Sequence, residues 1–219
     1  LSFLFLPPPP RSPNFQVSRV QAFLEAHAQP GERVGVCGSN SVAFIVAELA
    51  VLLGGYVLVP LDEHQAAEQM AVVAPVAGVF CDPGAAQRLG PCRFVLTWGV
   101  DASGNQNWES VLQQHPPSEL RACAPAPDAL LAVIFTSGGR KAVAWTEQIM
   151  RLGSQLPFDG VEPIEIADFL ATSHAFSRRL VLRALLHGGA IGVPYDRRNL
   201  DRLLLDIARI RVCTKQEHI

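Results

Sequence analysis

The sequence predicts an α/β fold with doubly wound, mainly parallel sheets and flanking helices. Short runs of branched apolar residues, typical of buried strands, alternate with segments of helical periodicity over most of the 219 residues. Such alternation favours parallel strands, because each helix returns the chain to the starting edge of the sheet. With 49% hydrophobic residues and a formal charge of −2, the chain fits a soluble globular protein and lacks the positive charge of a nucleic-acid-binding scaffold.

A proline-rich leader is expected over residues 1–17, followed by the first helix over residues 18–28. Residues 7–10 are four consecutive prolines, which cannot enter a helix interior or a central strand. We interpret them as a stiff leader, in preference to a peptide that a partner recognises, because composition alone is weak evidence for binding. In the helix, Val20 and Phe23 recur at helical spacing.

A strand–helix–strand unit is expected next. Residues 33–37 form a short Val-rich strand, and either Ser39 or Asn40 can cap the helix that follows. Residues 56–59 have the unbroken apolar character of a buried parallel strand, which we expect Pro60 to end.

The apolar stretch at residues 42–61 is long enough to be compared with a membrane span. It carries Glu48 near its middle and the pair Gly54 and Gly55 further on, which a continuous membrane helix would rarely hold. A helix, a turn and a strand explain it better, so we predict no transmembrane span.

The same alternation continues to the end of the chain. An irregular, proline-rich connection at residues 115–128 is a possible subdomain boundary. Further strands are expected at 78–81, 93–97, 130–135, 167–172 and 190–193, and further helices at 66–73, 84–89, 108–114, 146–152, 178–187 and 199–210.

The cysteines and histidines do not indicate a metal or redox site. Five cysteines are widely spaced, without a Cys-x-x-Cys pair, and the histidines form no cluster with metal-ligand spacing. We therefore expect reduced, buried thiols in a cytoplasmic protein, and no metal ligand is assigned. The cysteines are Cys37, Cys81, Cys92, Cys123 and Cys213.

One loop carries recognisable chemistry, because the strand-like run 130–135 is followed directly by hydroxyls, glycines and cations. Glycines let backbone N–H groups approach phosphate oxygens, hydroxyls donate hydrogen bonds, and Lys or Arg neutralises charge. An ordinary glycine-rich turn is the alternative, and the spacing matches neither a Walker A loop nor a dinucleotide-binding turn. The candidate phosphate-binding residues are Thr136, Ser137, Gly138, Gly139, Arg140 and Lys141.

This loop resembles that of the adenylate-forming (AMP-binding) ligase superfamily, which reads aromatic-Thr-Ser-Gly-[Ser/Thr]-Thr-Gly-x-Pro-Lys-[Gly/Ala]-Val. The run from Phe135 to Gly138 matches its start, and the run from Gly139 to Val143 matches its end. The family takes nine residues from Thr to Lys, whereas Thr136 to Lys141 takes six, so a hydroxyl pair and the proline are missing. A shortened loop of this kind is expected to hold a triphosphate less well.

Other stretches extend the resemblance over nearly the whole chain after the proline run. Residues 30–40 and 47–61 are similar to the family's amino-terminal subdomain. Residues 173–178 and 186–192 resemble the long-chain fatty acyl-CoA synthetases, which carry Ala-His-x-Phe-Glu-Arg and then His-Gly-x-x-Ile-Gly, except that Ser177 replaces the glutamate. The later family motifs find no match, so residues 18–219 are expected to be a partial, amino-terminal AMP-binding domain.

The resemblance implies an activity and a set of ligands. The protein would use ATP, with Mg²⁺, to convert a long-chain fatty acid into an acyl-adenylate and then, with CoA, into acyl-CoA. Lys141 would meet the β- and γ-phosphates, Arg140 would occupy the variable position, and His174 would lie near the acyl carboxylate. The alternatives are a catalytically inactive fragment or pseudoenzyme, and a ligase for another carboxylic acid.

The carboxy-terminal part of the chain is basic. Residues 171–219 hold nine Lys and Arg against four Asp and Glu. Arg178 and its neighbours could attract an anionic lipid surface or a CoA phosphate, so peripheral membrane contact is a possible addition to a cytoplasmic location. We favour a solvated helix face, because Asp196, Asp201 and Asp206 are interleaved as partners.

Overall fold

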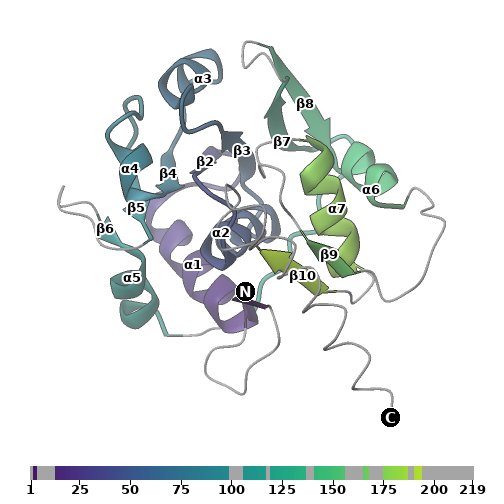
Figure 1. Ribbon diagram of the computed structural model, residues 1–219, viewed down its shortest axis with the longest axis horizontal. Helices are drawn as coiled ribbons and strands as arrows, with labels where there is room; N and C mark the ends of the chain where they lie inside the picture. Colours follow the sequence, from purple (N-terminus) through teal and green to yellow (C-terminus); the bar gives the residue numbers. More distant parts are fainter. Residues whose placement is uncertain are drawn as a thin grey trace, which may run out of the picture.

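The computed structural model describes residues 2–3, 13–98, 106–116, 119–136, 141–155, 165–167, 175–186 and 190–193. A seven-stranded sheet in the order β6-β5-β4-β2-β3-β7-β8 organises this part of the chain (Figure 1). Its first six strands in this order run parallel, and only β8 is antiparallel to its neighbour β7. The strands are β2 Arg33–Cys37, β3 Val57–Leu61, β4 Gly78–Cys81, β5 Phe94–Thr97, β6 Gln106–Asn107, β7 Leu130–Phe135 and β8 Ala142–Thr146.

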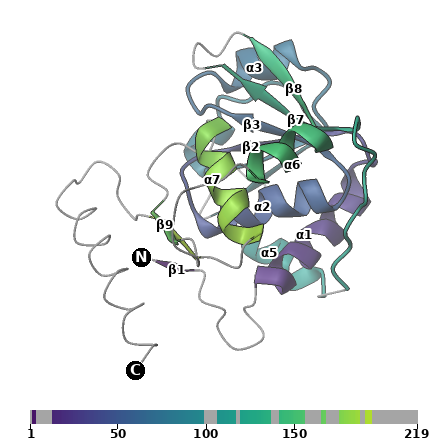
Figure 2. The ribbon, with the colours of Figure 1, turned by 90° about the vertical axis from the view of Figure 1, so that its right-hand side faces the viewer.

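Helices cover both faces of this sheet, as the doubly wound prediction requires (Figure 2). One apolar cluster packs α1, α2 and α5 on one face, and a second packs α3 and α4 on the other. Two further helices, α6 and α7, lie on the α2 side. The bounds are α1 Pro13–His27, α2 Val42–Leu53, α3 Ala66–Val72, α4 Pro83–Ala86, α5 Trp108–Gln114, α6 Glu147–Gln155 and α7 Ala175–Leu186.

A small second sheet, whose strand β10 packs against α2 and α7, joins distant parts of the chain. Strand β10, Ala190–Val193, pairs in parallel with β9, Glu165–Ala167, and antiparallel with β1, Ser2–Phe3. Of the expected strand at 167–172, only Ala167 lies within the described residues, where it belongs to β9. The expected helix at 199–210 is outside the described residues.

Several element ends differ from the sequence prediction for local reasons. Helix α1 begins at Pro13, five residues before the expected start, because proline is tolerated in the first turn of a helix. The cap of α2 is neither Ser39 nor Asn40 but Ser41, whose side chain accepts a hydrogen bond from the Phe44 amide at 3.1 Å. Pro60 lies inside β3, two residues beyond the Leu58–Ala132 pair that joins β3 to β7.

The sequence predicts no strand at residues 142–146, where the structure has β8. Residues 142–146 pair antiparallel with β7, with Phe135 opposite Ala142 and Leu130 opposite Thr146. The strand is mostly exposed and contacts one neighbouring strand, so it has no buried apolar pattern by which to be found. The candidate phosphate loop is therefore the turn of a β-hairpin, not a strand-to-helix connection.

The connection at 115–128 is bound to α1 and to the end of α2. Gln21 donates to the Arg121 carbonyl at 2.8 Å and accepts from the Arg121 amide at 3.2 Å, while the Cys123 amide donates to the Leu53 carbonyl at 2.8 Å. Strand β7 then joins the same sheet as the strands before the connection. A subdomain boundary here stays a prediction.

The apolar stretch at residues 42–61 forms α2, a glycine turn and β3. Among the described residues, no helix combines the length and the apolar character that crossing a membrane requires.

Candidate functional site

The sheet topology brings the candidate phosphate loop to the edge where α/β proteins bind ligands. Strands β2, β3, β4, β5 and β7 are parallel, so their carboxyl ends meet at one edge of the sheet (Figure 1). Strand β7 ends at Phe135 on this edge, and the loop begins at the next residue.

The two ends of the loop are held together by a main-chain hydrogen bond. The Thr136 amide donates to the Lys141 carbonyl at 3.0 Å, directly beyond the Phe135–Ala142 pair. Thr136 and Lys141 are both exposed. Ser137, Gly138, Gly139 and Arg140, the other predicted phosphate-binding residues, lie outside the described residues.

This geometry leaves two side-chain groups available for an anion. Neither the Thr136 hydroxyl nor the Lys141 ammonium has a partner among the described residues. The Thr136 amide, in contrast, already donates within the hairpin and is not free for a phosphate oxygen. The described part of the loop therefore fits a phosphate through one hydroxyl and one cation.

His174, the predicted acyl-site residue, also lies outside the described residues, and α7 begins at the next position, Ala175. The charge pattern predicts a solvated helix face for Arg178 in α7, but the structure buries this residue. Its side chain is 1% exposed and forms an ion pair with Glu48 of α2, which is itself buried. Pairing with a buried carboxylate explains why this arginine lies in the interior.

A polar cluster that the sequence analysis did not identify closes the crevice between the ends of β2 and β4. The strand order reverses here, since the chain leaves β2 toward β3 but leaves β4 toward β5. The Asp82 carboxylate accepts hydrogen bonds from the Ser39 amide, at 2.6 Å, and from the Trp98 indole. The available sequence signal was an aspartate directly after a buried strand.

Gly38 lets this cluster pack tightly. Its φ is +145°, and a Cβ added there would lie 2.6 Å from Asp82 Oδ2. The Asp82 carboxylate thus occupies the space beside Gly38 at the strand-order reversal, and the candidate phosphate loop lies further along the same edge, after β7.

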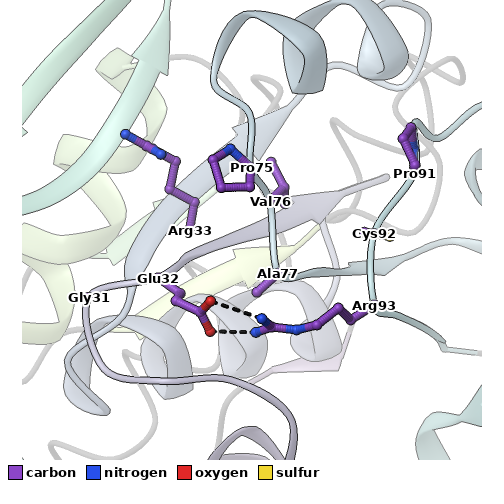
Figure 3. Close-up of a pocket in the computed structure, with 9 residues that line it drawn as sticks. All are labelled: Gly31, Glu32, Arg33, Pro75, Val76, Ala77, Pro91, Cys92 and Arg93. Atoms are coloured by element: carbon purple, nitrogen blue, oxygen red, sulfur yellow. Dashed lines mark hydrogen bonds and ion pairs between the residues drawn. The ribbon is translucent and has the colours of Figure 1, made fainter.

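A cavity of about 490 Å³ lies at the opposite edge of the sheet, where β2, β4 and β5 begin (Figure 3). Glu32 and Arg93 face one another across it in a two-point ion pair, with one N–O distance of 2.9 Å. The Arg93 guanidinium and the Gln29 amide hold the pKa of Glu32 below its ordinary value. This cavity is separated from the candidate phosphate loop by the length of the strands.

The cysteines fit the prediction only in part. Cys37 and Cys81 are buried thiols outside any disulfide, as expected, and burial raises the pKa of the Cys37 thiol to about 12. Cys92 is partly buried. Cys123 is exposed, because it lies in the irregular connection at 115–128. Within the described ranges, no group of three or more His, Cys, Asp or Glu residues could hold a metal ion.

Comparison with solved structures shows a known fold. The chain is similar to the anthranilate CoA ligase AuaEII, with a TM-score of 0.78 and 13% identity over 92% of this chain and 42% of that one. It is also similar to a benzoate CoA ligase from Burkholderia xenovorans LB400, with a TM-score of 0.73 and 17% identity over 89% and 41% of the two chains. A protein assigned as a long-chain-fatty-acid CoA ligase from Rhodopseudomonas palustris CGA009 has a TM-score of 0.64 and 19% identity over 81% and 48%.

Sequence comparison indicates the same group of proteins. The nonribosomal peptide synthetase ecdA from Aspergillus rugulosus is 25% identical over 197 residues, which is 86% of this chain and 3% of that protein. The chain therefore spans less than half of each of these related proteins. The family model described as "AMP-binding enzyme" matches residues 14–214. The chain belongs to the AMP-binding enzyme family, whose members form adenylates.

Proposed function

We propose that this chain is the amino-terminal part of a ligase that activates a long-chain fatty acid. ATP and the fatty carboxylate would give an acyl-adenylate and pyrophosphate, and the CoA thiol would then displace AMP to form the thioester. The observation that carries the proposal is the placement of Thr136 and Lys141 together at the carboxyl edge of a parallel sheet, in a chain of the AMP-binding family. The fatty acid as substrate rests on the similarity of residues 173–178 and 186–192 to acyl-CoA synthetases.

Two described groups would act on the nucleotide. The Lys141 ammonium neutralises charge on the β- and γ-phosphates while the carboxylate attacks the α-phosphorus, and the Thr136 hydroxyl donates to a phosphate oxygen. Mg²⁺ bound with ATP supplies further neutralisation of the phosphate charge. Ser137, Gly138, Gly139 and Arg140 complete the proposed loop, and His174 positions the carboxylate.

Calorimetric titration with Mg·ATP tests the nucleotide site. We expect saturable heat of binding with a folded chain. The absence of heat at millimolar nucleotide would show that this chain does not bind ATP. Pyrophosphate release by the full-length protein over a panel of acids then tests the substrate. We expect faster pyrophosphate release with palmitate and oleate than with benzoate and anthranilate, the acids after which two of the similar ligases are named.

The second candidate is a catalytically inactive relative of the ligases, a pseudoenzyme that is retained for binding. The observation that favours it is the six-residue span from Thr136 to Lys141, which ends in a closed hairpin that uses the Thr136 amide. Inserting Ser-Thr-Gly after Gly138 brings the loop to the family's length. A gain of Mg·ATP affinity on insertion supports the second candidate, whereas unchanged, saturable binding by both loops supports the first.

The remaining partners follow from the proposed reaction. Fatty acid and CoA are small-molecule substrates, and a cytoplasmic location with peripheral membrane contact stays a prediction. Arg178 is not available to a lipid headgroup, because Glu48 binds it in the interior. Flotation with vesicles containing phosphatidylserine would test the contact, and recovery of the protein only in the vesicle-free fraction would exclude it.

A further inference from the structure

We propose that the open edge of β8 is an interaction surface that pairs with β8 of a second copy of this chain. The two strands run antiparallel and are related by a two-fold axis at Val143, so each copy contributes the same residues. This surface does not depend on the proposed ligase activity.

Strand β8 is the last strand of the sheet. It pairs with β7 on one side, and it has no neighbouring strand on the other side in the part of the chain that the structure describes (Figure 1). Edge strands of natural proteins are usually protected by a charge, a proline or a bulge. Residues 142–144 are exposed and carry neither a charge nor a proline, and the irregularity in the pairing lies further along, at Leu130 and Ala132. The edge is therefore open to a further strand.

The pairing with β7 shows which main-chain groups of β8 are free. The Thr136 amide donates to the Lys141 carbonyl at 3.0 Å, so the main-chain groups of Lys141 face β7. Successive residues of a strand direct their N–H and C=O groups to alternate sides, so those of Val143 also face β7, whereas those of Ala142 and Ala144 face the open edge. Among the described residues, the amides and carbonyls of these two alanines have no partner.

The pattern of this edge fits an identical strand. In an antiparallel pair centred on Val143, Ala142 of one copy lies opposite Ala144 of the other, and each amide donates to the opposite carbonyl. The run from Ala142 to Ala144 reads the same in both directions, so small side chains meet small side chains on both sides of the axis. The two Val143 side chains meet at a non-hydrogen-bonded position, where cross-strand side chains are closest. No residue from 142 to 146 is charged, so no like charges are brought together there.

Exposed apolar side chains lie on one side of the same edge. Val143 is 45% exposed and pairs with Ile134, which belongs to the apolar cluster on the α2 side of the sheet. Helix α6 follows β8 on this side, and its residues Ile149 and Leu152 are 47% and 52% exposed (Figure 2). Exposed apolar residues that gather in this way mark association surfaces, and pairing removes Val143 from water.

Sedimentation equilibrium of the 219-residue chain tests the proposal. A short ladder with a small apolar contact fits a reversible dimer with a Kd of about 1–100 µM. Val143→Lys places two like charges at the axis and should weaken the dimer about tenfold or more. Val72→Lys, at an exposed position of α3, is the matched control and should leave the Kd unchanged. A chain that is monomeric well above this concentration range overturns the proposal.

Two further kinds of variant separate this pairing from other associations. Ala144→Pro removes an N–H group that β7 does not use, so it should prevent the dimer and leave the circular dichroism of the monomer unchanged. Val143→Cys places two thiols opposite one another at the axis, within reach of a disulfide, whereas Ala144→Cys does not. Under mild oxidation we expect the Val143→Cys variant to cross-link about fivefold faster or more than the Ala144→Cys variant and the wild type.

Two outcomes would assign the contact elsewhere. Equal cross-linking of both cysteine variants, or a dimer that Val143→Lys leaves intact, overturns the pairing at Val143. A full-length protein that is monomeric where the 219-residue chain dimerises would show that another part of the same protein covers β8, and it also overturns the proposal.

Discussion

The carboxylate of Glu48 and the guanidinium of Arg178 form an ion pair whose side chains are 7% and 1% exposed. The pair joins α2 to α7 across 130 positions of the sequence. Two nitrogens of Arg178, Nε and Nη1, are buried without a hydrogen-bond partner, so the loss of hydration is only partly compensated. Such a pair makes the packing of the two helices depend on both charges being present.

Removing one partner of this ion pair should strongly lower the free energy of unfolding, whereas replacing both partners should lower it much less. Arg178→Met leaves Glu48 buried without its counter-charge and should lower the free energy of unfolding by about 3–5 kcal/mol. The double variant Glu48→Leu with Arg178→Met replaces the pair by apolar side chains and should recover most of that loss. Urea unfolding measures both.

The control for this pair is Arg151→Met, which removes an exposed ion pair with Glu147 within α6 and should cost about 0.5 kcal/mol or less. If the Glu48 and Arg178 substitutions prove additive, the two side chains do not stabilise one another.

Lys141 should control nucleotide affinity if the hairpin turn binds phosphate. Lys141→Ala removes the cation directly before β8 and should weaken Mg·ATP binding about tenfold or more, since a charge-assisted contact is lost. Lys215→Ala, which changes the other lysine of the chain, is the matched control and should leave the affinity unchanged. Equal binding by the wild type and the Lys141 variant in calorimetry would contradict the assignment.

Gly38 should tolerate no side chain, because the Asp82 carboxylate occupies the space. In Gly38→Ala the new Cβ would meet Asp82 Oδ2 at 2.6 Å on a backbone with φ of +145°, so we expect a loss of about 1–3 kcal/mol. Gly84→Ala is the control, since a Cβ there meets nothing within 4 Å. Thermal unfolding followed by tryptophan fluorescence reports the change, because Trp98 is bound to Asp82. A stable Gly38 variant would show that the crevice is not closed as described.

The ion pair between Glu32 and Arg93 should make stability depend on acid pH. The pKa of Glu32 is lowered in the folded protein, first by the Arg93 guanidinium. The contribution of Glu32 to the free energy of unfolding is therefore complete above the unfolded-state pKa and is lost as the pH falls through the folded-state pKa. Glu32→Gln should therefore be slightly less stable than the wild type at pH 7, and the difference should shrink below about pH 4. The measurement is urea unfolding over a pH series, with Glu68→Gln, at an exposed position of α3, as control. A stability difference between Glu32→Gln and the wild type that stays constant with pH excludes the linkage.

Patterns of residues close in the chain were enough to predict the α/β class and most of the buried elements. Strand β7 and helix α5 lie at their predicted bounds, and β2 does as well, because these segments carry a strong periodicity or an unbroken apolar run. The position of Thr136 and Lys141 after a buried strand was also readable, as was membership of the adenylate-forming group, since both depend on residues that are adjacent in the chain.

Features that depend on contacts between distant residues could not be predicted in this way. Strand β8 has an exposed pattern and exists because β7 offers it an open edge. The charge pattern predicts a surface position for Arg178, but the ion pair with Glu48 places it in the interior. Asp82 accepts hydrogen bonds from Ser39 and Trp98, which follow the ends of neighbouring strands. Periodicity reports which residues are apolar, whereas the partner of a buried charge or an edge strand is set by how the elements pack.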